Sequence, residues 1–192
     1  MKETLTQPTT DQLEAEMARV SYRLRSGRVL RSTIYALVIV AAAAVLIATL
    51  WLPILQIYGS SMTPTLEEGE IVVAAKGSRF DTGDVIAFYY NNKMLVKRVI
   101  ASAGQWVNID EDGTVYVDNV KIDEPYLTEK AFGDCDLKLP YQVPDGRLFV
   151  MGDHRATSVD SRNTVVGCVA EEQIVGKIVF CIWPMERLGH VS

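Results

Sequence analysis

A run of 35 residues without a charged side chain, from Ser32 to Leu66, most constrains what this chain can fold into. Within it, residues 33–52 (TIYALVIVAAAAVLIATLWL) supply about the 20 apolar residues that a helix needs to cross a bilayer. A cleaved targeting segment is the competing interpretation, but its apolar core is shorter and lies closer to the N-terminus. We therefore predict a retained transmembrane helix over residues 32–54, with Trp51 and Tyr58 at the membrane interface.

The charges on either side of this span predict its orientation. Residues 1–31 carry a net charge of +2 and residues 32–192 a net charge of −7. The first positive charge after the span is Lys76, whereas five arginines precede it: Arg19, Arg23, Arg25, Arg28 and Arg31. The positive-inside rule then places residues 1–31 in the cytoplasm, and the domain after the span outside the cell membrane.

The same charges narrow the choice of partners. The arginine-rich end fits anionic lipid headgroups, whereas an acidic outer domain offers no surface for nucleic acid. Residues 1–17 are polar and predict a disordered tail, while residues 12–30 favour helix.

The sulfur and imidazole groups give no sign of a metal site. The three cysteines form no Cys-x-x-Cys pair, and two histidines do not complete a zinc set, so we predict neither a metal nor a cofactor. Cys135, Cys168 and Cys181 are compatible with one disulfide and one free thiol, or with three reduced thiols.

Beyond the span, residues 55–192 form a domain whose pattern changes from helical to strand-like. Asn91-Asn92-Lys93 and Asp112-Gly113 are hairpin signals, and residues 123–146 look like an irregular insertion with three of the seven prolines. Strands are predicted over residues 70–75, 84–90, 94–101, 106–109, 114–117, 147–151 and 174–183. Short strands separated by turns predict a mostly β domain, barrel-like or sandwich-like.

The segment at residues 59–66 (GSSMTPTL) is a candidate for carrying a nucleophile. Pro64 fixes the backbone there, so a serine in this segment is exposed and rigidly aimed. It is not the Gly-x-Ser-x-Gly elbow of the α/β-hydrolases, because Thr63 replaces the second glycine. Taken alone, Gly-Ser-Ser is also typical of a flexible linker.

A serine nucleophile needs a base, and histidine is the familiar choice. His190 lies close to the C-terminal end and is a poor candidate. His154 makes a Ser61–His154–Asp160 triad arithmetically possible. The alternative, which we favour, is that His154 caps or fills a loop.

Lys97 is the other candidate base, because it lies among apolar residues in the segment 95–100 (LVKRVI). Neighbouring side chains on a strand face opposite ways, so Lys97 and Arg98 cannot share a face and one must point to the more buried side. Burial lowers the pKa of a lysine into the range of a general base, whereas arginine stays protonated. A second interpretation stays open, in which both side chains reach water from an edge strand.

A loop over residues 152–162 (GDHRATSVDSR) is dense in side chains that form charge-assisted hydrogen bonds. An ordinary solvated loop would have a similar composition. Together with three earlier segments, however, this loop resembles the type I signal peptidases, in the Gram-positive bacterial form with a single N-terminal anchor. The four segments occur in the family's order: residues 61–66 (SMTPTL), 83–86 (GDVI), 96–100 (VKRVI) and 152–162.

The resemblance implies a membrane-anchored serine endopeptidase with a Ser/Lys dyad and a mostly β catalytic domain over residues 55–192. Ser61 matches the nucleophile, Lys97 the general base, and Ser158 the hydroxyl that orients the lysine. Four residues match positions that hold the loops by ion pairs: Asp153, Asp160, Arg98 and Arg162. Three match positions that line a pocket for small residues: Met62, Leu66 and Val96.

The implied reaction removes signal peptides from exported preproteins after Ala-x-Ala-like residues. Its partners are preprotein signal peptides and the lipid bilayer, and the oligomeric state stays open. Gly59 departs from members with a serine hydroxyl in the oxyanion hole, and His154 replaces the family's usual asparagine. A catalytically silent, membrane-tethered binding module and a self-cleaving regulator are the alternatives.

Overall fold

The structure is a computed structural model that describes residues 10–77 and 79–191. The chain divides into two compact units, one ending at Ala48 and the other beginning at Thr49, and each is described by itself. The first nine residues of the predicted disordered tail lie outside the described residues. For residues 10–17 that prediction is wrong, because they are helical.

A single helix, α1 (Thr10–Trp51), contains the apolar run. Its segment Val29–Trp51 is long and apolar enough to cross a membrane, as the sequence predicts. The helix ends just before Pro53, whose ring fixes φ and which has no N–H to continue the ladder. Ile54, which the sequence places at the end of the span, instead begins the first strand.

The β-rich unit contains two antiparallel sheets. The larger sheet has the strand order β1-β2-β11-β3-β4-β9-β10, with β12 paired to β11. Its strands are β1 (Ile54–Gln56), β2 (Ile71–Ala75), β3 (Val85–Tyr90), β4 (Lys93–Ala101), β9 (Arg147–Met151), β10 (Val169–Ala170), β11 (Ile174–Trp183) and β12 (Gly189–His190). Two short 3₁₀ turns, Glu171–Gln173 and Met185–Arg187, flank β11.

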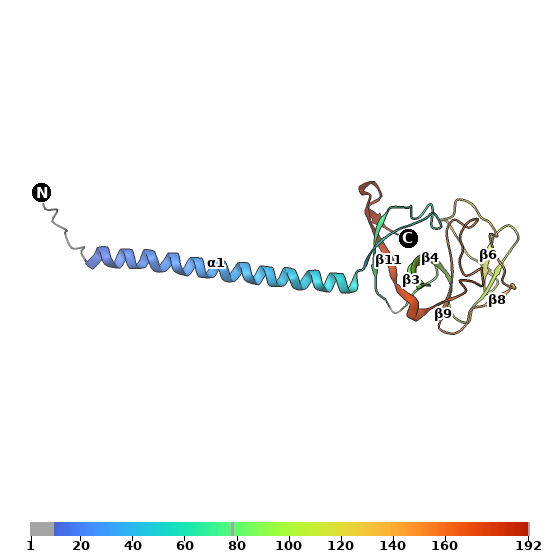
Figure 1. The fold of residues 1–192 in the computed structure, drawn as a ribbon, viewed down its shortest axis with the longest axis horizontal. Coiled ribbons are helices and arrows are strands. Elements are labelled where there is room, and N and C mark those ends of the chain that lie inside the picture. Colours follow the sequence, from blue (N-terminus) through green and yellow to red (C-terminus); the bar gives the residue numbers. More distant parts are fainter. Residues whose placement is uncertain (1–9, 78, 192) are drawn as a thin grey trace. The chain divides into compact units, whose positions relative to one another are not determined.

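The smaller sheet has the order β7-β6-β5-β8. Its strands are β5 (Trp106–Ile109), β6 (Val115–Val117), β7 (Val120–Lys121) and β8 (Tyr141–Gln142). In Figure 1 the strands β3 and β4 lie between β11 and this smaller sheet, which is marked by β6 and β8. The mostly β fold predicted from the sequence is confirmed.

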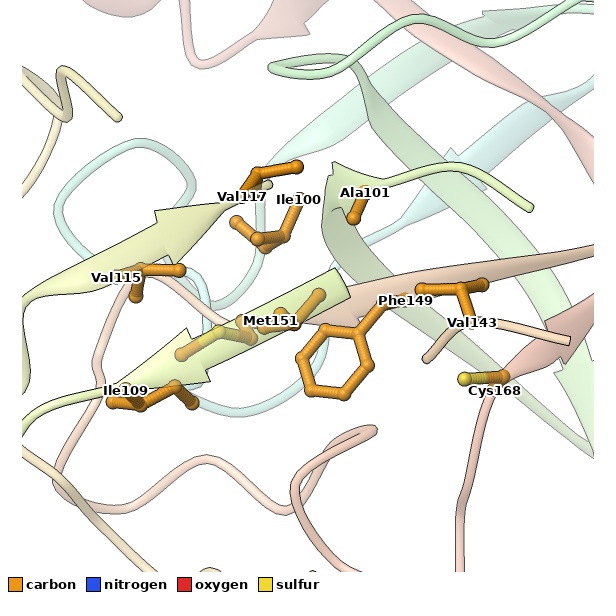
Figure 2. Close-up of a cluster of buried hydrophobic side chains, with 10 residues drawn as sticks. Ile100, Ala101, Ile109, Val115, Val117, Val143, Phe149, Met151 and Cys168 are labelled. Carbon is orange, nitrogen blue, oxygen red and sulfur yellow. The ribbon is translucent and has the colours of Figure 1, made fainter. Parts of the chain in front are cut away.

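One buried cluster joins the two sheets. Side chains of β5 and β6, including Ile109 and Val115, pack against Ile100 of β4 and Phe149 of β9 (Figure 2). The cluster is almost entirely aliphatic and aromatic, so its burial removes apolar surface from water without leaving polar groups unpaired. The smaller sheet is thereby fixed to the strand that carries Lys97.

The turn between β3 and β4 sets the register of the site. Asn91 and Asn92 have φ values of 43° and 61°, the left-handed conformation that a two-residue hairpin of this kind requires. Tyr90 therefore pairs with Lys93, and Ile86 pairs with Lys97 further along. The hairpin predicted from Asn91-Asn92-Lys93 is confirmed.

The strand β4 is central, with β3 on one side and β9 on the other. Both of its adjacent basic side chains are buried, with Lys97 3% and Arg98 1% exposed. The interpretation in which both reach water from an edge strand is therefore wrong, because neither face of β4 is open to solvent at this point.

Candidate active site

Ser61 lies in the connection between β1 and β2, where two buried neighbours fix the backbone. Met62 and Leu66 are 2% and 0% exposed and pack in one cluster with Ile57 and Val72. The Leu66 N–H donates to Met62 O at 2.9 Å, so the segment turns between these two apolar anchors. Ser61, immediately before the first anchor, is half-buried and does not behave as part of a flexible linker.

Lys97 projects from β4 into the interior. Its Nζ donates a hydrogen bond to Ser158 Oγ at 3.0 Å. Burial lowers the pKa of Lys97 from 10.5 to about 8; Asp160 opposes this shift, Arg162 adds to it, and Asp153 opposes it. At pH 7 a lysine with this pKa is neutral in about one molecule in ten, roughly 300 times more often than an unperturbed lysine.

Gly152 brings the two halves of the site together. A Cβ at this position would lie 2.2 Å from Ser158 Oγ and 2.5 Å from the backbone oxygen of Ser61, so only glycine fits. The His154 N–H also donates to Ser61 O at 3.1 Å. Within the described residues no hydrogen bond joins Ser61 Oγ to Lys97 Nζ; the two residues are linked through Ser158 and this loop.

Two buried arginine–aspartate pairs hold the surrounding loops. Arg98 donates to both carboxylate oxygens of Asp153, at 2.9 and 2.8 Å, and also to Gly83 O at 2.7 Å. Arg162 donates to both oxygens of Asp160 at 2.9 Å. Bidentate pairs of this kind fix orientation as well as charge.

Asp160 is fully buried, and this affects its titration. Burial by itself raises the pKa of Asp160, but the hydrogen bonds and charge of Arg162 outweigh it and hold the pKa below its ordinary value. The Gly152 N–H, which donates to Asp160 at 3.0 Å, acts in the same direction. The carboxylate therefore stays ionised beside Lys97.

The triad considered from the sequence does not form. Both carboxylate oxygens of Asp160 accept hydrogen bonds from Arg162. The ring of the exposed His154 lies 3.0 Å from Thr157 Oγ1 instead. A carboxylate committed to a buried guanidinium is not available to orient a histidine. His154 thus contributes its backbone to the Ser61 segment, in line with the loop-filling role that the sequence favours.

A largely apolar cavity of about 400 Å³ opens beside Ser61. Met62 and Val96 line it, together with other residues of two segments, 55–62 and 93–96. Leu66 does not line this cavity; it lies fully buried in the cluster behind Met62. An apolar cavity next to a serine suits aliphatic side chains.

Sequence reasoning missed four residues that complete the site. Thr65 Oγ1 donates to Asp153 at 2.5 Å and accepts from Arg98. Arg187 donates to the Pro64 and Thr65 backbone oxygens at 3.0 and 2.9 Å. Glu124 forms an ion pair with Arg155, and the ring of Tyr126 lies against the Arg98 guanidinium. Apart from the hydrogen bond between Tyr126 and Glu124, these contacts join residues that are 28 or more positions apart along the chain, so no local pattern could reveal them.

Cys135, Cys168 and Cys181 are all free thiols in the structure, as in the second of the two arrangements considered from the sequence. Cys168 and Cys181 are buried, and burial raises the pKa of each thiol, that of Cys168 to about 11. Thiols of this kind are unreactive near neutral pH.

Comparison with known proteins places the sequence of this chain in a family. The family model for "Signal peptidase, peptidase S26" matches residues 30–183. Signal peptidase IB of Staphylococcus aureus is 38% identical over 154 residues, covering 70% of this chain and 79% of that protein. Signal peptidase I of Bacillus amyloliquefaciens is 36% identical over 170 residues, covering 82% of this chain and 87% of that protein.

Among solved structures, a crystal structure of a signal peptidase I from Enterococcus faecalis is 28% identical. The match has a TM-score of 0.45 and covers 52% of this chain and 97% of the Enterococcus faecalis chain. The family model spans most of this sequence, and the two relatives each match over more than two thirds of both lengths. The chain therefore belongs to the signal peptidase I family, peptidase S26.

Proposed function

We propose that this protein removes signal peptides from exported preproteins after Ala-x-Ala-like residues, with Ser61 as nucleophile and Lys97 as general base. The observation that carries the proposal is the buried Lys97 amine with its pKa of about 8, hydrogen-bonded to Ser158 beside the Ser61 segment. An amine with this pKa can accept a proton at physiological pH, which an exposed lysine rarely does.

Lys97 takes up and releases a proton once in acylation and once in deacylation. Neutral Lys97 takes the proton of Ser61 as Oγ attacks the scissile carbonyl carbon and forms a C–O bond. The resulting ammonium then gives that proton to the leaving amine as the C–N bond breaks, and an acyl-enzyme remains on Ser61. Neutral Lys97 next deprotonates a water, whose oxygen attacks the ester carbonyl carbon. As the C–O bond to Ser61 breaks, the Lys97 ammonium returns that proton to Ser61 Oγ, and the signal peptide leaves as a carboxylic acid that ionises.

Backbone N–H groups provide most of the stabilisation of the oxyanion in the tetrahedral intermediate. Gly59 supplies no hydroxyl at the position where some family members have a serine, so the Ser61 N–H is the donor that we assign to the tetrahedral intermediate. Gly59 has φ of +80°, which bends the chain immediately before the serine pair.

The apolar cavity supports a preference for small residues upstream of the cleaved bond. Met62 and Val96 line the cavity of about 400 Å³ next to Ser61, and this mostly apolar lining is compatible with the small aliphatic residues of an Ala-x-Ala site. Leu66 acts from behind the wall, where it supports Met62.

Membrane attachment places enzyme and substrate in the same thin layer, which raises their effective concentration. The arginines that precede the apolar residues 33–52 within α1 support a cytoplasmic N-terminus and an extracytoplasmic catalytic domain. Ile54 and Tyr58, 63% and 77% exposed, are available for contact with lipid. Full activity of a chain lacking residues 1–56, without detergent or lipid, would contradict a role for this contact.

The test is cleavage of a preprotein with an Ala-x-Ala site by the detergent-purified full chain. We expect wild type and His154→Ala to cut the substrate, and Ser61→Ala and Lys97→Ala to leave it intact. Activity of Lys97→Ala with loss in His154→Ala would show that the base is misassigned. A wild type that cuts none of several preproteins would favour a catalytically silent binding module.

A further inference from the structure

Two side chains from the irregular region 123–146 reach into the site. The Glu124 carboxylate forms a buried ion pair with the Arg155 guanidinium, and its Oε2 accepts from Nη1 at 3.3 Å. The two side chains are 2% and 0% exposed, so water does not screen their charges. Tyr126 donates its hydroxyl to Glu124 Oε1 at 2.9 Å and places its ring 3.9 Å from the Arg98 guanidinium carbon.

The two arginines that these side chains contact belong to the two segments joined by the Lys97–Ser158 hydrogen bond. Arg98 directly follows Lys97 on β4 and holds Asp153. Arg155 donates from Nε to Gly152 O at 3.1 Å, within the loop that presents Ser158. A cation over an aromatic face and a buried charge pair both have preferred geometries, so each arginine is restrained by a contact additional to those it makes in the site.

We propose that Glu124 and Tyr126 are positioning residues that hold Lys97 and Ser158 in register by fixing Arg98 and Arg155. The proposal rests on the function proposed above for Ser61 and Lys97. Neither Glu124 nor Tyr126 touches the reacting atoms; each acts through an arginine. Residues 123–146 thus supply part of the catalytic scaffold, in addition to any influence on substrate choice.

Disturbing this scaffold has two expected consequences. Misplacing a general base by about 1 Å costs on the order of 100-fold in rate. Substrate binding should be little affected, because neither Glu124 nor Tyr126 lines the apolar cavity. Water admitted near Arg98 also reduces the burial of Lys97, which is the largest cause of its lowered pKa. The charged groups that act on Lys97 are Asp160, Arg162 and Asp153, and none of them is altered by the variants below.

The experiment compares three variants of the full chain in detergent. Tyr126→Phe keeps the ring over Arg98, Tyr126→Leu removes it, and Glu124→Gln keeps the shape but removes the charge. Tyr116→Leu, on β6 of the smaller sheet, is the matched control.

We expect Tyr126→Leu to lower kcat by roughly 10- to 100-fold with KM changed by less than about threefold. Glu124→Gln should lower kcat by a smaller factor, while Tyr126→Phe and Tyr116→Leu stay within about threefold of wild type.

A second readout does not depend on cleavage. The pH dependence of Lys97 acylation by acetic anhydride, followed by mass spectrometry, reports the pKa of its amine directly. We expect Tyr126→Leu to raise that pKa above the wild-type value, and Tyr126→Phe to leave it unchanged. This readout also decides the inference if wild type cuts no preprotein and the proposed function fails.

Two results would overturn the positioning role. The first is a folded Tyr126→Leu with wild-type kcat and an unchanged Lys97 pKa. The second is a loss of stability and an increase in KM without any change in the Lys97 pKa, which would assign Tyr126 and Glu124 to packing alone. If Tyr126→Leu does not fold, Glu124→Gln decides: wild-type kcat and an unchanged Lys97 pKa in that variant overturn the role.

Discussion

The burial of Lys97 makes a prediction about stability that is independent of any substrate. A charged ammonium that is 3% exposed is costly in the folded chain, because burial disfavours the charged form. Replacing it by methionine removes the charge and keeps a side chain of similar length. We therefore expect Lys97→Met to be inactive and yet more stable than wild type at neutral pH.

The magnitude follows from the pKa of Lys97, which falls from 10.5 to about 8 on folding. Each pKa unit corresponds to about 1.4 kcal/mol, so the cost of the charged form is about 3 kcal/mol. The substitution also loses the hydrogen bond from Lys97 to Ser158, worth about 1 kcal/mol. The expected net gain is about 2 kcal/mol at pH 6 to 7.

The gain depends on pH with a definite sign. Below pH 8 the ammonium is charged in both folded and unfolded chains, so wild type bears the whole cost. Between about 8 and 10.5 folding releases a proton, and the stability of wild type rises with pH. Above 10.5 the amine is neutral in both states, and the advantage of Lys97→Met disappears.

The assay is urea unfolding of the full chain in detergent, followed by tryptophan fluorescence at several pH values. Lys177→Met is the matched control, because this lysine is 42% exposed and pairs with Asp84 at the surface. It should change stability by about 1 kcal/mol or less at every pH. The reasoning is refuted if Lys97→Met is no more stable than wild type at pH 6, or if the difference does not shrink at higher pH.

Three further substitutions test separate parts of the site. Gly152→Ala should abolish cleavage, because its Cβ would lie 2.2 Å from Ser158 Oγ; activity within tenfold of wild type would contradict this close approach. Val96→Phe should lower kcat/KM for Ala-x-Ala preproteins by at least about tenfold by filling the apolar cavity, and an unchanged value would place the substrate elsewhere. Arg187→Ala removes the ion pair partner that lies 2.7 Å from the buried Glu70 carboxylate, and urea unfolding should show a loss of about 3 kcal/mol, against less than 0.5 kcal/mol if the pair is irrelevant.

Most of the fold could be predicted from the sequence because the longer strands carry clear patterns. Every strand of four or more residues was expected within one residue of its observed bounds. Of the shorter strands, β6 was also expected, as residues 114–117. The strands β1, β7, β8, β10 and β12 were not, since two or three residues seldom show a clear period. Ile54–Gln56 was further concealed by the apolar run that it continues.

The site was predictable where a residue type is unusual for its surroundings. Lys97 among apolar strand residues is such a case, and it is buried, as the pattern indicates. Whether Arg98 would be buried as well depended on the position of β4 within the sheet, which strand patterns do not give. The pairing of Glu124 with Arg155 is equally invisible, because it depends on how residues 123–146 fold back over the loop.

The measurement that bears most directly on the Ser61–Lys97 dyad is the pH dependence of kcat/KM for preprotein cleavage. We expect activity to rise through an apparent pKa near 8 in wild type, with the same limb in His154→Ala and no activity in Lys97→Ala. A pH dependence of kcat/KM that disappears in His154→Ala, or clear activity of Lys97→Ala, would contradict a lysine general base.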